Sequence, residues 1–394
     1  MATGDAAYIK KINRSLIISK IIEERMISRA DLSKRTALTR ATISAQAADL
    51  LDEELIIETQ QEHNTVGRRP IMLSLNDKAG CALGIDLDYG SITFALTDLL
   101  GRPVSSKTME IDTTDYDYIL GVLAKNIKAY QESCSDRRYG LVGVVIAIHG
   151  LVTNDEIIHF IPRFQWQSKN LKQDLEKEVN ITIHLENNAN LSSFAERVYS
   201  HHDTDNLLCA TLYSGIGLGI MINGEFFKGH DGYAGEVGHM IVNPGGKKCN
   251  CGNLGCWEQY ASESTFFREL AQLKEQPNIS YEDIRNWIEA GDQPVHEMME
   301  QFIYYLSIGL NNMINIYNPG VLVLNSELLK LYPNAIDRLK EHFTSTVSHY
   351  RELSISTLGK KSCVLGAAAL AIKQFLDIPT LDLTFEQEEI VAVP

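Results

Sequence analysis

The first fifty residues of the chain carry apolar side chains at helical spacing, separated by residues that favour helix starts. A first amphipathic helix is predicted by Ile9, Ile12, Leu16 and Ile21. Ser28-Arg29-Ala30-Asp31 matches a capping pattern, in which the serine hydroxyl accepts a hydrogen bond from a backbone N–H at the start of a second helix. The second helix is expected to continue through Leu32 to Arg35.

A third predicted helix begins after a break at Ala37-Leu38, and Thr39 can cap it. Its inner face carries Ile43, Ala47, Leu50 and Leu51. Together with the cap, its outer face presents small or polar groups that can enter a DNA major groove: Thr39, Arg40, Thr42, Ser44 and Ala45. We therefore expect the third helix to be the recognition helix.

Two apolar stretches, residues 55–59 and 71–75, follow this helix and flank a polar loop that contains Gly67-Arg68-Arg69-Pro70. This pattern predicts a β-wing with Arg68 and Arg69 at its tip, where they can contact phosphates or a minor groove. A three-helix protein-binding module with a solvated basic face would show the same helix spacing. The arginine-tipped wing favours a winged helix-turn-helix that binds DNA.

From Gly80 onward, short apolar strands alternate with helical stretches, which predicts an α/β body in two lobes. Strands are expected at 81–86, 92–98, 141–148, 181–185, 207–213, 219–222 and 321–324, and helices at 119–130, 302–317 and 364–375. The predicted domains are the winged head at 1–77, a first lobe at 78–190 completed by 364–394, and a second lobe at 191–363.

His239 and three cysteines within eight residues form the sharpest motif of the chain: Cys249, Cys251 and Cys256. Three thiolates and one imidazole make up a tetrahedral zinc set, and the interleaved glycines allow the tight turns that it needs. Free buried cysteines that happen to cluster are the alternative. A closed Cys₃His set leaves no position for water, so we expect one structural, non-catalytic Zn²⁺ per chain.

Charge is distributed unevenly along the chain, although its sum is −15. Residues 1–75 contain 11 Lys/Arg and 10 Asp/Glu (net +1), and the other 319 residues contain 25 and 41 (net −16). Such a chain can bind DNA only through its head. No apolar run is long enough to span a bilayer, and residues 1–25 do not resemble a signal peptide. We therefore expect a cytoplasmic protein without a membrane partner.

The segment Gly232-Tyr233-Ala234-Gly235-Glu236-Val237-Gly238-His239, the cysteine cluster and Trp257-Glu258 resemble the ROK family (repressors, open reading frames and sugar kinases). The resemblance extends over nearly the whole chain. Within the family, Gly67-Arg68-Arg69-Pro70 and Cys256-Trp257-Glu258 are most similar to the xylose repressors of Gram-positive bacteria. The resemblance to the ROK family implies an actin-like, ribonuclease H-like pair of lobes with a sugar cleft between them.

The resemblance also implies roles for individual residues. The sugar hydroxyls would be contacted by Asn187, Asn188, Glu236, His239 and Glu258. Carboxylates and amides suit this role, because they offer paired acceptors and donors. Zinc would be bound by His239, Cys249, Cys251 and Cys256. The alternative for Glu236 and Glu258 is a pair of surface carboxylates, which their nearness to the expected metal ligands disfavours.

Departures from the pattern of the family's kinases point away from catalysis. The kinases have an aspartate as general base where this chain has Asn188, and an amide does not titrate near neutral pH. Asp86-Leu87-Asp88-Tyr89-Gly90 adds a negative charge to the first phosphate loop, and Asn325-Ser326 replaces a glycine pair on the adenosine side. Only the loop at 214–219 still resembles a phosphate-binding loop, which is weak support for an enzyme.

The sequence specifies the sugar ligand less closely than it specifies the metal ligands. His149-Gly150 and Pro162-Arg163-Phe164-Gln165-Trp166 both differ from the family pattern in the first lobe. Arg163 is expected at a reshaped cleft mouth, and Phe164 and Trp166 are either sugar-stacking or core residues. Xylose, a glucose-type sugar and a short oligosaccharide all remain candidates.

These patterns predict a sugar-responsive repressor of a carbohydrate-catabolism operon that is released from operator DNA by the bound sugar. We expect it to act as a homodimer or a higher oligomer, because winged heads usually contact paired half-sites. The alternatives are a ROK sugar kinase with an accessory DNA-binding head and a regulator that is activated by sugar or responds to a partner protein.

Overall fold

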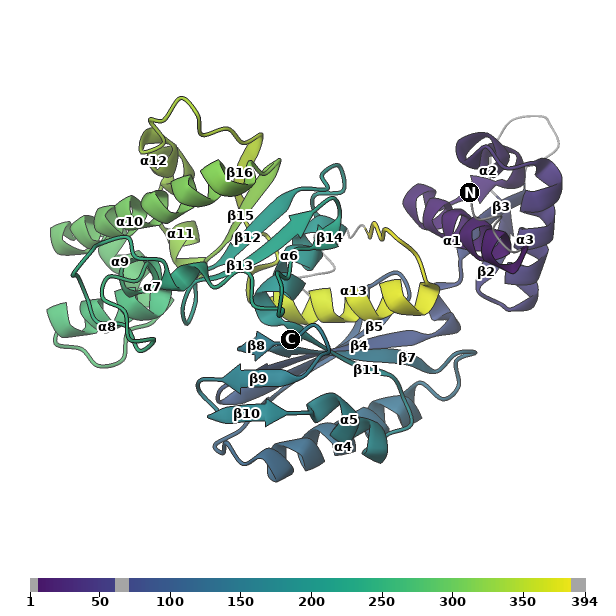
Figure 1. Cartoon of the computed structure of the whole chain (residues 1–394), viewed down its shortest axis with the longest axis horizontal. Coiled ribbons are helices and arrows are strands. Elements are labelled where there is room, and N and C mark those ends of the chain that lie inside the picture. Colours follow the sequence, from purple (N-terminus) through teal and green to yellow (C-terminus); the bar gives the residue numbers. More distant parts are fainter. Residues whose placement is uncertain (1–5, 61–70, 384–394) are drawn as a thin grey trace. The chain divides into compact units, whose positions relative to one another are not determined.

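The structure is a computed structural model that describes residues 6–60 and 71–383 (Figure 1). The chain forms two compact units. The first unit comprises the chain up to Asn187, the tripeptide Val198–Ser200 and the chain from Val364 onward. The second unit comprises Asn188–Arg197 and His201–Cys363. Within the described residues, none of the helices is both long and apolar enough to cross a membrane.

The head of the first unit has the predicted helix-turn-helix with a small sheet. Its elements are α1 (Ala6–Glu24), β1 (Ile27–Ser28), α2 (Arg29–Thr36), α3 (Arg40–Asp52), β2 (Ile56–Gln60) and β3 (Ile71–Leu75). The sheet has the order β1-β3-β2, and β2 and β3 are antiparallel. The predicted wing residues Arg68 and Arg69 lie outside the described residues.

Both predicted helix caps of the head are confirmed. The Ser28 hydroxyl accepts a hydrogen bond from the Asp31 N–H at 3.1 Å, and the Thr39 hydroxyl accepts one from the Thr42 N–H at 3.1 Å. The turn between α2 and α3 passes through Ala37 in the left-handed conformation, with φ 57°. These contacts satisfy backbone donors that the first turn of a helix leaves free.

The buried face of α1 differs from the one that the spacing suggested. Ile9, Ile12 and Leu16 are 51, 48 and 37% exposed. The residues of α1 that reach the core are Ile17, Ile18, Ile21 and Ile22. Helical periodicity therefore identified the helix and the buried Ile21 correctly but misplaced the other three residues, because the core of the head covers only the second half of α1.

The body of the first unit is built on a five-stranded sheet with the order β11-β7-β4-β5-β6. Its strands are β4 (Cys81–Asp88), β5 (Ser91–Asp98), β6 (Pro103–Glu110), β7 (Leu141–Ile148) and β11 (Ile183–Asn187). β4, β7 and β11 are parallel, so their carboxyl ends meet at one edge of the sheet. A smaller sheet contains β8 (Leu151–Val152), β9 (Ile158–Ile161) and β10 (Trp166–Lys169).

Helices cover both faces of this sheet (Figure 1). They are α4 (Tyr116–Ser133) and α5 (Leu171–Glu178) on one face and α13 (Ser362–Leu376) on the other. Alternation along β4 explains the arrangement, since Leu83 and Ile85 join the α4 core while Gly84 faces α13. A Cβ on Gly84 would lie 2.1 Å from the Val364 carbonyl oxygen, so only glycine allows this close approach.

The second unit repeats this layered arrangement around a sheet with the order β14-β13-β12-β15-β16. Its strands are β12 (Leu207–Thr211), β13 (Gly217–Ile222), β14 (Glu225–Phe226), β15 (Val321–Asn325) and β16 (Glu352–Ile355). β12, β15 and β16 are parallel. The helices are α7 (Glu258–Ala261), α8 (Glu263–Leu273), α9 (Tyr281–Glu289), α10 (Gln293–Tyr317), α11 (Glu327–Leu331) and α12 (Ala335–Glu341).

Helix α6 (Asn188–Tyr199), whose residues up to Arg197 belong to the second unit, packs on the opposite face of this sheet. A Cβ on Gly219 would lie 2.1 Å from the Ala189 carbonyl oxygen. The core of the unit centres on Trp257, which is fully buried and donates its indole N–H to the Tyr305 carbonyl oxygen at 2.8 Å. Short 3₁₀ turns at Asp77–Ala79, Val237–His239 and Gly359–Lys361 complete the fold.

Candidate functional site

The predicted metal ligands come together in the second unit. One ligand atom from each of His239, Cys249, Cys251 and Cys256 lies within 4.8 Å of all the others. The Nδ1 atom of His239 is 3.6 Å from the sulfur of Cys249, and the sulfurs of Cys251 and Cys256 are 3.6 Å apart. A tetrahedral site with zinc–sulfur bonds of about 2.3 Å requires ligand atoms roughly 3.8 Å apart. The donor set therefore fits a metal ion.

The local backbone explains why the four ligands converge. His239 ends a 3₁₀ turn, and β-bridges join Ile241 to Cys256 and Lys248 to Leu254. Gly255 has φ 90°, and a Cβ there would lie 1.8 Å from the Asn243 carbonyl oxygen. Glycine is required at this turn because any side chain would push the cysteine loop away from the segment after His239.

Two carboxylates flank His239 on different sides of its ring. The Nδ1 atom is 3.6 Å from the Glu258 carboxylate, and the Nε2 atom is 3.9 Å from that of Glu236. Burial raises the pKa of Glu236; repulsion by Glu258 acts in the same direction, and His239 opposes both. The arrangement leaves Nδ1 for a metal and Nε2 facing a carboxylate, as in many histidine-bound metal sites.

The two carboxylate oxygens of Glu258 have different neighbours. Its carboxylate accepts hydrogen bonds from the Cys249 thiol at 3.1 Å and from the Gln259 side-chain amide at 3.4 Å. A Cβ on Gly215 would lie 2.8 Å from the other carboxylate oxygen. The glycine-rich loop at 214–219 thus passes directly beside Glu258, and the metal cluster and this carboxylate share one small region of the second unit.

The other residues expected to bind sugar are distributed over the two units. Asn188 begins α6 in the second unit and is half-buried. Asn187 ends β11 in the first unit, where its side-chain amide donates to the Gly150 carbonyl oxygen at 3.0 Å. Arg163, also in the first unit, is exposed, and its guanidinium carbon is 5.7 Å from the centre of the Tyr89 ring. The structure directly groups Glu236, His239 and Glu258.

Phe164 and Trp166 are core residues of the first unit. They are 3 and 4% exposed, and their ring centres are 4.9 Å apart. The Trp166 indole N–H donates to the Thr114 carbonyl oxygen at 2.7 Å. Of the two roles open from the sequence, the structure supports packing over sugar stacking.

An ion cluster at the carboxyl ends of β4 and β7 was missed from the sequence. His149 Nε2 is 2.7 Å from the Asp86 carboxylate, and its Nδ1 is 3.7 Å from that of Asp88. Burial lowers the pKa of His149, but the two carboxylates outweigh it, and the net shift is upward. The sequence does place a histidine and an aspartate at the ends of two predicted strands. Their pairing can be predicted only when the two strands are known to be parallel neighbours in this register.

In the head, the outer face of α3 is accessible as predicted. Thr39, Arg40, Ser44 and Ala45 are exposed, whereas Thr42 is half-buried and its hydroxyl lies 2.9 Å from that of Thr39. Ile43, Ala47 and Leu50 are fully buried. The buried side chains fix the helix in the domain, and the small exposed ones leave room for a close approach to base edges.

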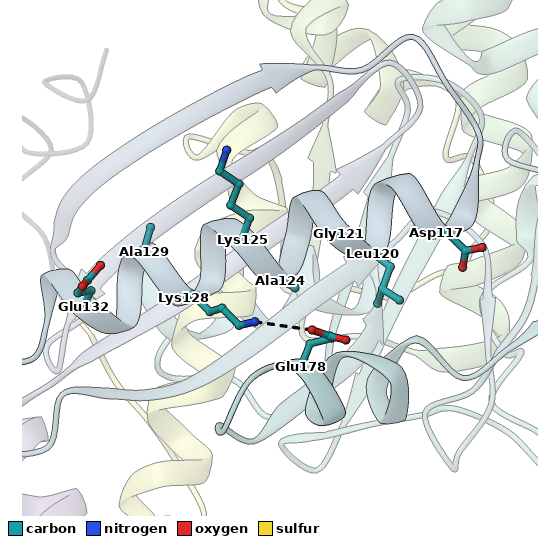
Figure 2. Close-up of a pocket in the computed structure, with 9 residues that line it drawn as sticks. All are labelled: Asp117, Leu120, Gly121, Ala124, Lys125, Lys128, Ala129, Glu132 and Glu178. Atoms are coloured by element: carbon teal, nitrogen blue, oxygen red, sulfur yellow. Dashed lines mark ion pairs between the residues drawn. The ribbon is translucent and has the colours of Figure 1, made fainter.

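A surface recess lies elsewhere, along α4 in the first unit (Figure 2). Its lining includes Leu120, Gly121 and Ala124 of α4, and an ion pair of 3.6 Å joins Lys128 to Glu178 of α5 across it. The recess contains none of the residues expected to bind sugar or metal, so we do not assign it a ligand.

The chain is similar to known proteins in both sequence and structure. The sequence model of the ROK family matches residues 82–374. The xylose repressor of Bacillus subtilis (strain 168) is 34% identical, over 97% of this chain and 100% of that protein. A crystal structure of a ROK family transcriptional regulator, described as a homolog of the E. coli MLC protein, has a TM-score of 0.79 and 28% identity, covering 93% of this chain and 96% of that one.

The body alone also matches an enzyme. The ROK family glucokinase from Streptomyces griseus, solved in complex with glucose and AMPPNP, has a TM-score of 0.64 and 23% identity. The match covers 75% of this chain and 99% of the glucokinase. At this identity the likeness establishes a shared fold and does not transfer an activity.

Proposed function

The chain belongs to the ROK family, and we propose that it is a sugar-responsive, DNA-binding transcriptional repressor of a carbohydrate-catabolism operon. The observation that carries this proposal is the exposed α3 face of a helix-turn-helix joined to a ROK body. Similarity to a xylose repressor over nearly the full length of both chains supports the same function. We expect the protein to act in the cytoplasm.

Operator binding would depend on the outer face of α3. Its exposed residues Thr39, Arg40, Ser44 and Ala45, together with Thr42, are expected to contact base edges and phosphates. Arg68 and Arg69 are expected to add phosphate or minor-groove contacts from the wing. Paired half-sites would be contacted by a homodimer or a higher oligomer, at a spacing of one helical turn or a multiple, about 34–36 Å per turn.

Sugar binding would depend on Glu236, His239 and Glu258 in the second unit, and Asn187, Asn188 and Arg163 are the other residues that we propose to contact sugar. His239 lies 3.6 Å from the Glu258 carboxylate and 3.9 Å from that of Glu236, which supports this set because neighbouring hydroxyls of one sugar ring need closely placed partners. Asn188 can donate and accept hydrogen bonds but cannot remove a proton. The candidate ligands are xylose, a glucose-type sugar and a short oligosaccharide.

The Cys₃His cluster would hold one structural Zn²⁺ per chain. The ligands His239, Cys249, Cys251 and Cys256 fit a tetrahedral ion in type and spacing. The ion would cross-link the segment around His239 to the cysteine loop. Its role would be structural, because the protein fills all four coordination positions. The four ligand residues would then hold Glu236 and Glu258 at fixed positions beside His239.

Repression and sugar binding would be linked through two arrangements of the protein. The sugar can release the operator only if it binds one arrangement more tightly, and couplings of this kind typically amount to about 1–3 kcal/mol. Metal loss should weaken sugar binding, because His239 and Glu258 would no longer be positioned.

Fluorescence anisotropy on the DNA upstream of the gene tests the proposal. The metal-loaded protein should bind this DNA tightly, and one member of a panel of pentoses, hexoses and short glucosides should release it. Arg40→Ala should weaken operator binding, whereas Arg285→Ala on α9, in the second unit and also exposed, should not. Specific binding that no sugar alters would refute the sugar response, and absence of any specific binding would refute the repressor.

A ROK sugar kinase with an accessory DNA-binding head is the alternative. It retains the glycine-rich loop at 214–219 but has Asn188 in place of a base. A coupled assay of ADP release over the same sugar panel decides between the two. Turnover by the unmodified protein would favour the kinase, and we expect none.

A further inference from the structure

Helix α13 begins in the second unit and continues into the first. Its first two residues belong to the second unit, and the rest of the helix belongs to the first. At its start, the side-chain amide of the buried Asn325 donates to the Ser362 hydroxyl at 2.7 Å and to the Gly359 carbonyl oxygen at 3.0 Å. Asn325 ends β15, so these two hydrogen bonds fix the start of α13 to the sheet of the second unit.

The middle of α13 packs closely on the sheet of the first unit. A Cβ on Gly84 of β4 would lie 2.1 Å from the Val364 carbonyl oxygen and 2.8 Å from the Ala368 nitrogen. The small side chains of residues 367–369 are fully buried. Close-packed interiors transmit strain, and a helix of 15 residues is about 22 Å long. α13 is therefore a stiff connection between its two ends.

The residue that follows α13 contacts the first helix of the head. The Asp377 carbonyl oxygen accepts a hydrogen bond from the Ser15 hydroxyl of α1 at 2.8 Å. The Asp377 carboxylate also lies 2.9 Å from the Lys11 ammonium group. Both members of this ion pair are exposed, so the pair contributes little to stability. The hydrogen bond from Ser15 is the more specific contact, because it holds the backbone directly after α13.

Tyr139 connects the end of α13 to the recognition helix. Its ring centre lies 5.1 Å from that of Phe375 in an edge-to-face contact, and Phe375 is in the last turn of α13. The Tyr139 hydroxyl donates to the Glu53 carbonyl oxygen at 2.8 Å, and Glu53 is the C-cap of α3. The Tyr139 N–H donates to the Ala79 carbonyl oxygen at 2.7 Å, which holds this tyrosine to the body.

The same cap residue also ties the two helices of the head together. The Arg14 guanidinium of α1 donates to the Glu53 carboxylate at 3.0 Å. The backbone of Glu53 thus faces Tyr139, while its side chain faces α1. A change in the position of Tyr139 would therefore act on α3 and α1 through one residue.

We propose that α13 transmits sugar binding to the DNA-binding head, and that Tyr139 is the positioning residue through which the end of α13 acts on α3. The inference rests on the proposed function, because it requires a repressor that responds to sugar. A displacement of α13 would move Phe375 and Asp377 together. Since Tyr139 packs on Phe375 and holds the cap of α3, the recognition helix would have to follow. Tyr139 needs no contact with DNA or sugar for this role.

Tyr139→Phe tests the inference, because it keeps the ring beside Phe375 and removes only the donor to Glu53. Fluorescence anisotropy on the DNA upstream of the gene measures operator affinity of the full-length, metal-loaded protein with and without xylose, glucose or maltose. For the sugar that releases the unmodified protein, the ratio of the two affinities should fall at least about threefold in the variant, since one hydrogen bond contributes a modest net free energy. Tyr118→Phe, at an exposed tyrosine of α4, should keep the ratio unchanged.

The ratio separates transmission from a structural role. If Tyr139 only stabilised the head, Tyr139→Phe would lower operator affinity equally with and without sugar, and this result would overturn its positioning role. Ser15→Ala removes the hydrogen bond to the Asp377 carbonyl oxygen and should also lower the ratio; an unchanged ratio there would overturn the role of α13. Thermal unfolding checks that each variant is folded.

The same measurements distinguish this inference from the proposed function. Operator binding by the unmodified protein that none of the three sugars alters would contradict the sugar response, and the inference would fail with it. Release of the unmodified protein by sugar, together with the same ratio in Tyr139→Phe, would refute the inference alone.

Discussion

Two titratable side chains of this protein have pKa values that the fold shifts upward. His149 lies between Asp86 and Asp88 at the edge of the first unit's sheet, and Glu196 is buried in the second unit. Their protonation states depend on opposite causes: carboxylates favour the charged imidazole, whereas burial favours the neutral carboxyl group. Stability should therefore vary with pH through these two residues in ways that substitutions can isolate.

His149→Gln should reduce the pH dependence of stability above neutrality. The raised pKa of folded His149 means that its contribution to stability is complete below its unfolded pKa of 6.5 and is lost as the pH rises through the folded value. Thermal unfolding between pH 6 and pH 9 should show a steeper decline for the unmodified protein than for the variant. His230→Gln, at a side chain that is 98% exposed, is the control. Parallel pH profiles for His149→Gln and the unmodified protein would contradict the assignment.

Glu196→Gln should stabilise the second unit at alkaline pH. Burial raises the pKa of Glu196 from 4.5 to about 7, so ionisation at pH 8 occurs at a cost that glutamine avoids. A difference of one pKa unit corresponds to about 1.4 kcal/mol, so the stabilisation by Glu196→Gln should not exceed roughly 3 kcal/mol. Urea unfolding at pH 8 and pH 4.5 measures the free energy of unfolding, which should become equal for the variant and the unmodified protein at the lower pH. A variant less stable than the unmodified protein at pH 8 would contradict it.

Gly255→Ala should disrupt the metal loop without unfolding the units. The added methyl group would meet the Asn243 carbonyl oxygen at 1.8 Å, and φ 90° is unfavourable for alanine. We expect bound zinc, measured by atomic emission, to fall well below one per chain. Gly245→Ala shares the positive φ (74°) but has open space around its Cβ, and serves as the matched control. Full zinc occupancy in Gly255→Ala would contradict the proposed role of this turn.

At the scale of elements, helix starts were predictable because their chemistry is local. Ser28 and Thr39 each accept a backbone N–H within three residues, and the sequence alone identified both. The start of α10 was predicted at 302 but lies at Gln293. Asp292, whose carboxylate accepts the Val295 N–H at 3.2 Å, and the following proline were signals available in the sequence.

Contacts between elements were not predictable in the same way. The pairing of His149 with Asp86 requires β4 and β7 to be parallel neighbours in a given register. The contacts of Tyr139 with Glu53 and Phe375 likewise depend on three separate segments. Periodicity and spacing describe one segment at a time, so they identified the metal ligands, which are close in sequence, and missed these clusters.

Thr39→Ala should weaken both the recognition helix and operator binding. Loss of the cap at the Thr42 N–H costs about 1 kcal/mol of stability. Because α3 presents the DNA-binding face, operator affinity should fall while sugar affinity remains unchanged. Anisotropy and calorimetry on the same protein measure the two affinities. Ser280→Ala removes the cap of α9 in the second unit and should leave operator affinity intact; an equal loss in both variants would contradict a specific role for α3.

At the scale of the whole molecule, the chain combines a helix-turn-helix with a ROK body. We propose that Asn188 stands where the family's kinases have a base, and Asp86, Asp88 and His149 form an ion cluster at the carboxyl ends of β4 and β7. Similarity to a xylose repressor spans the same combination of parts. The sugar site is then useful as a sensor, provided that its occupancy changes the affinity for DNA.

That coupling is the central claim, and calorimetry of sugar binding with and without operator tests it most directly. Linkage requires that DNA weaken sugar binding by the same factor by which sugar weakens DNA binding, typically about 5–150-fold. We predict a reduction in this range when the protein is saturated with operator, for the sugar that releases DNA in the anisotropy panel. Equal sugar affinity in the presence and absence of operator would contradict the account.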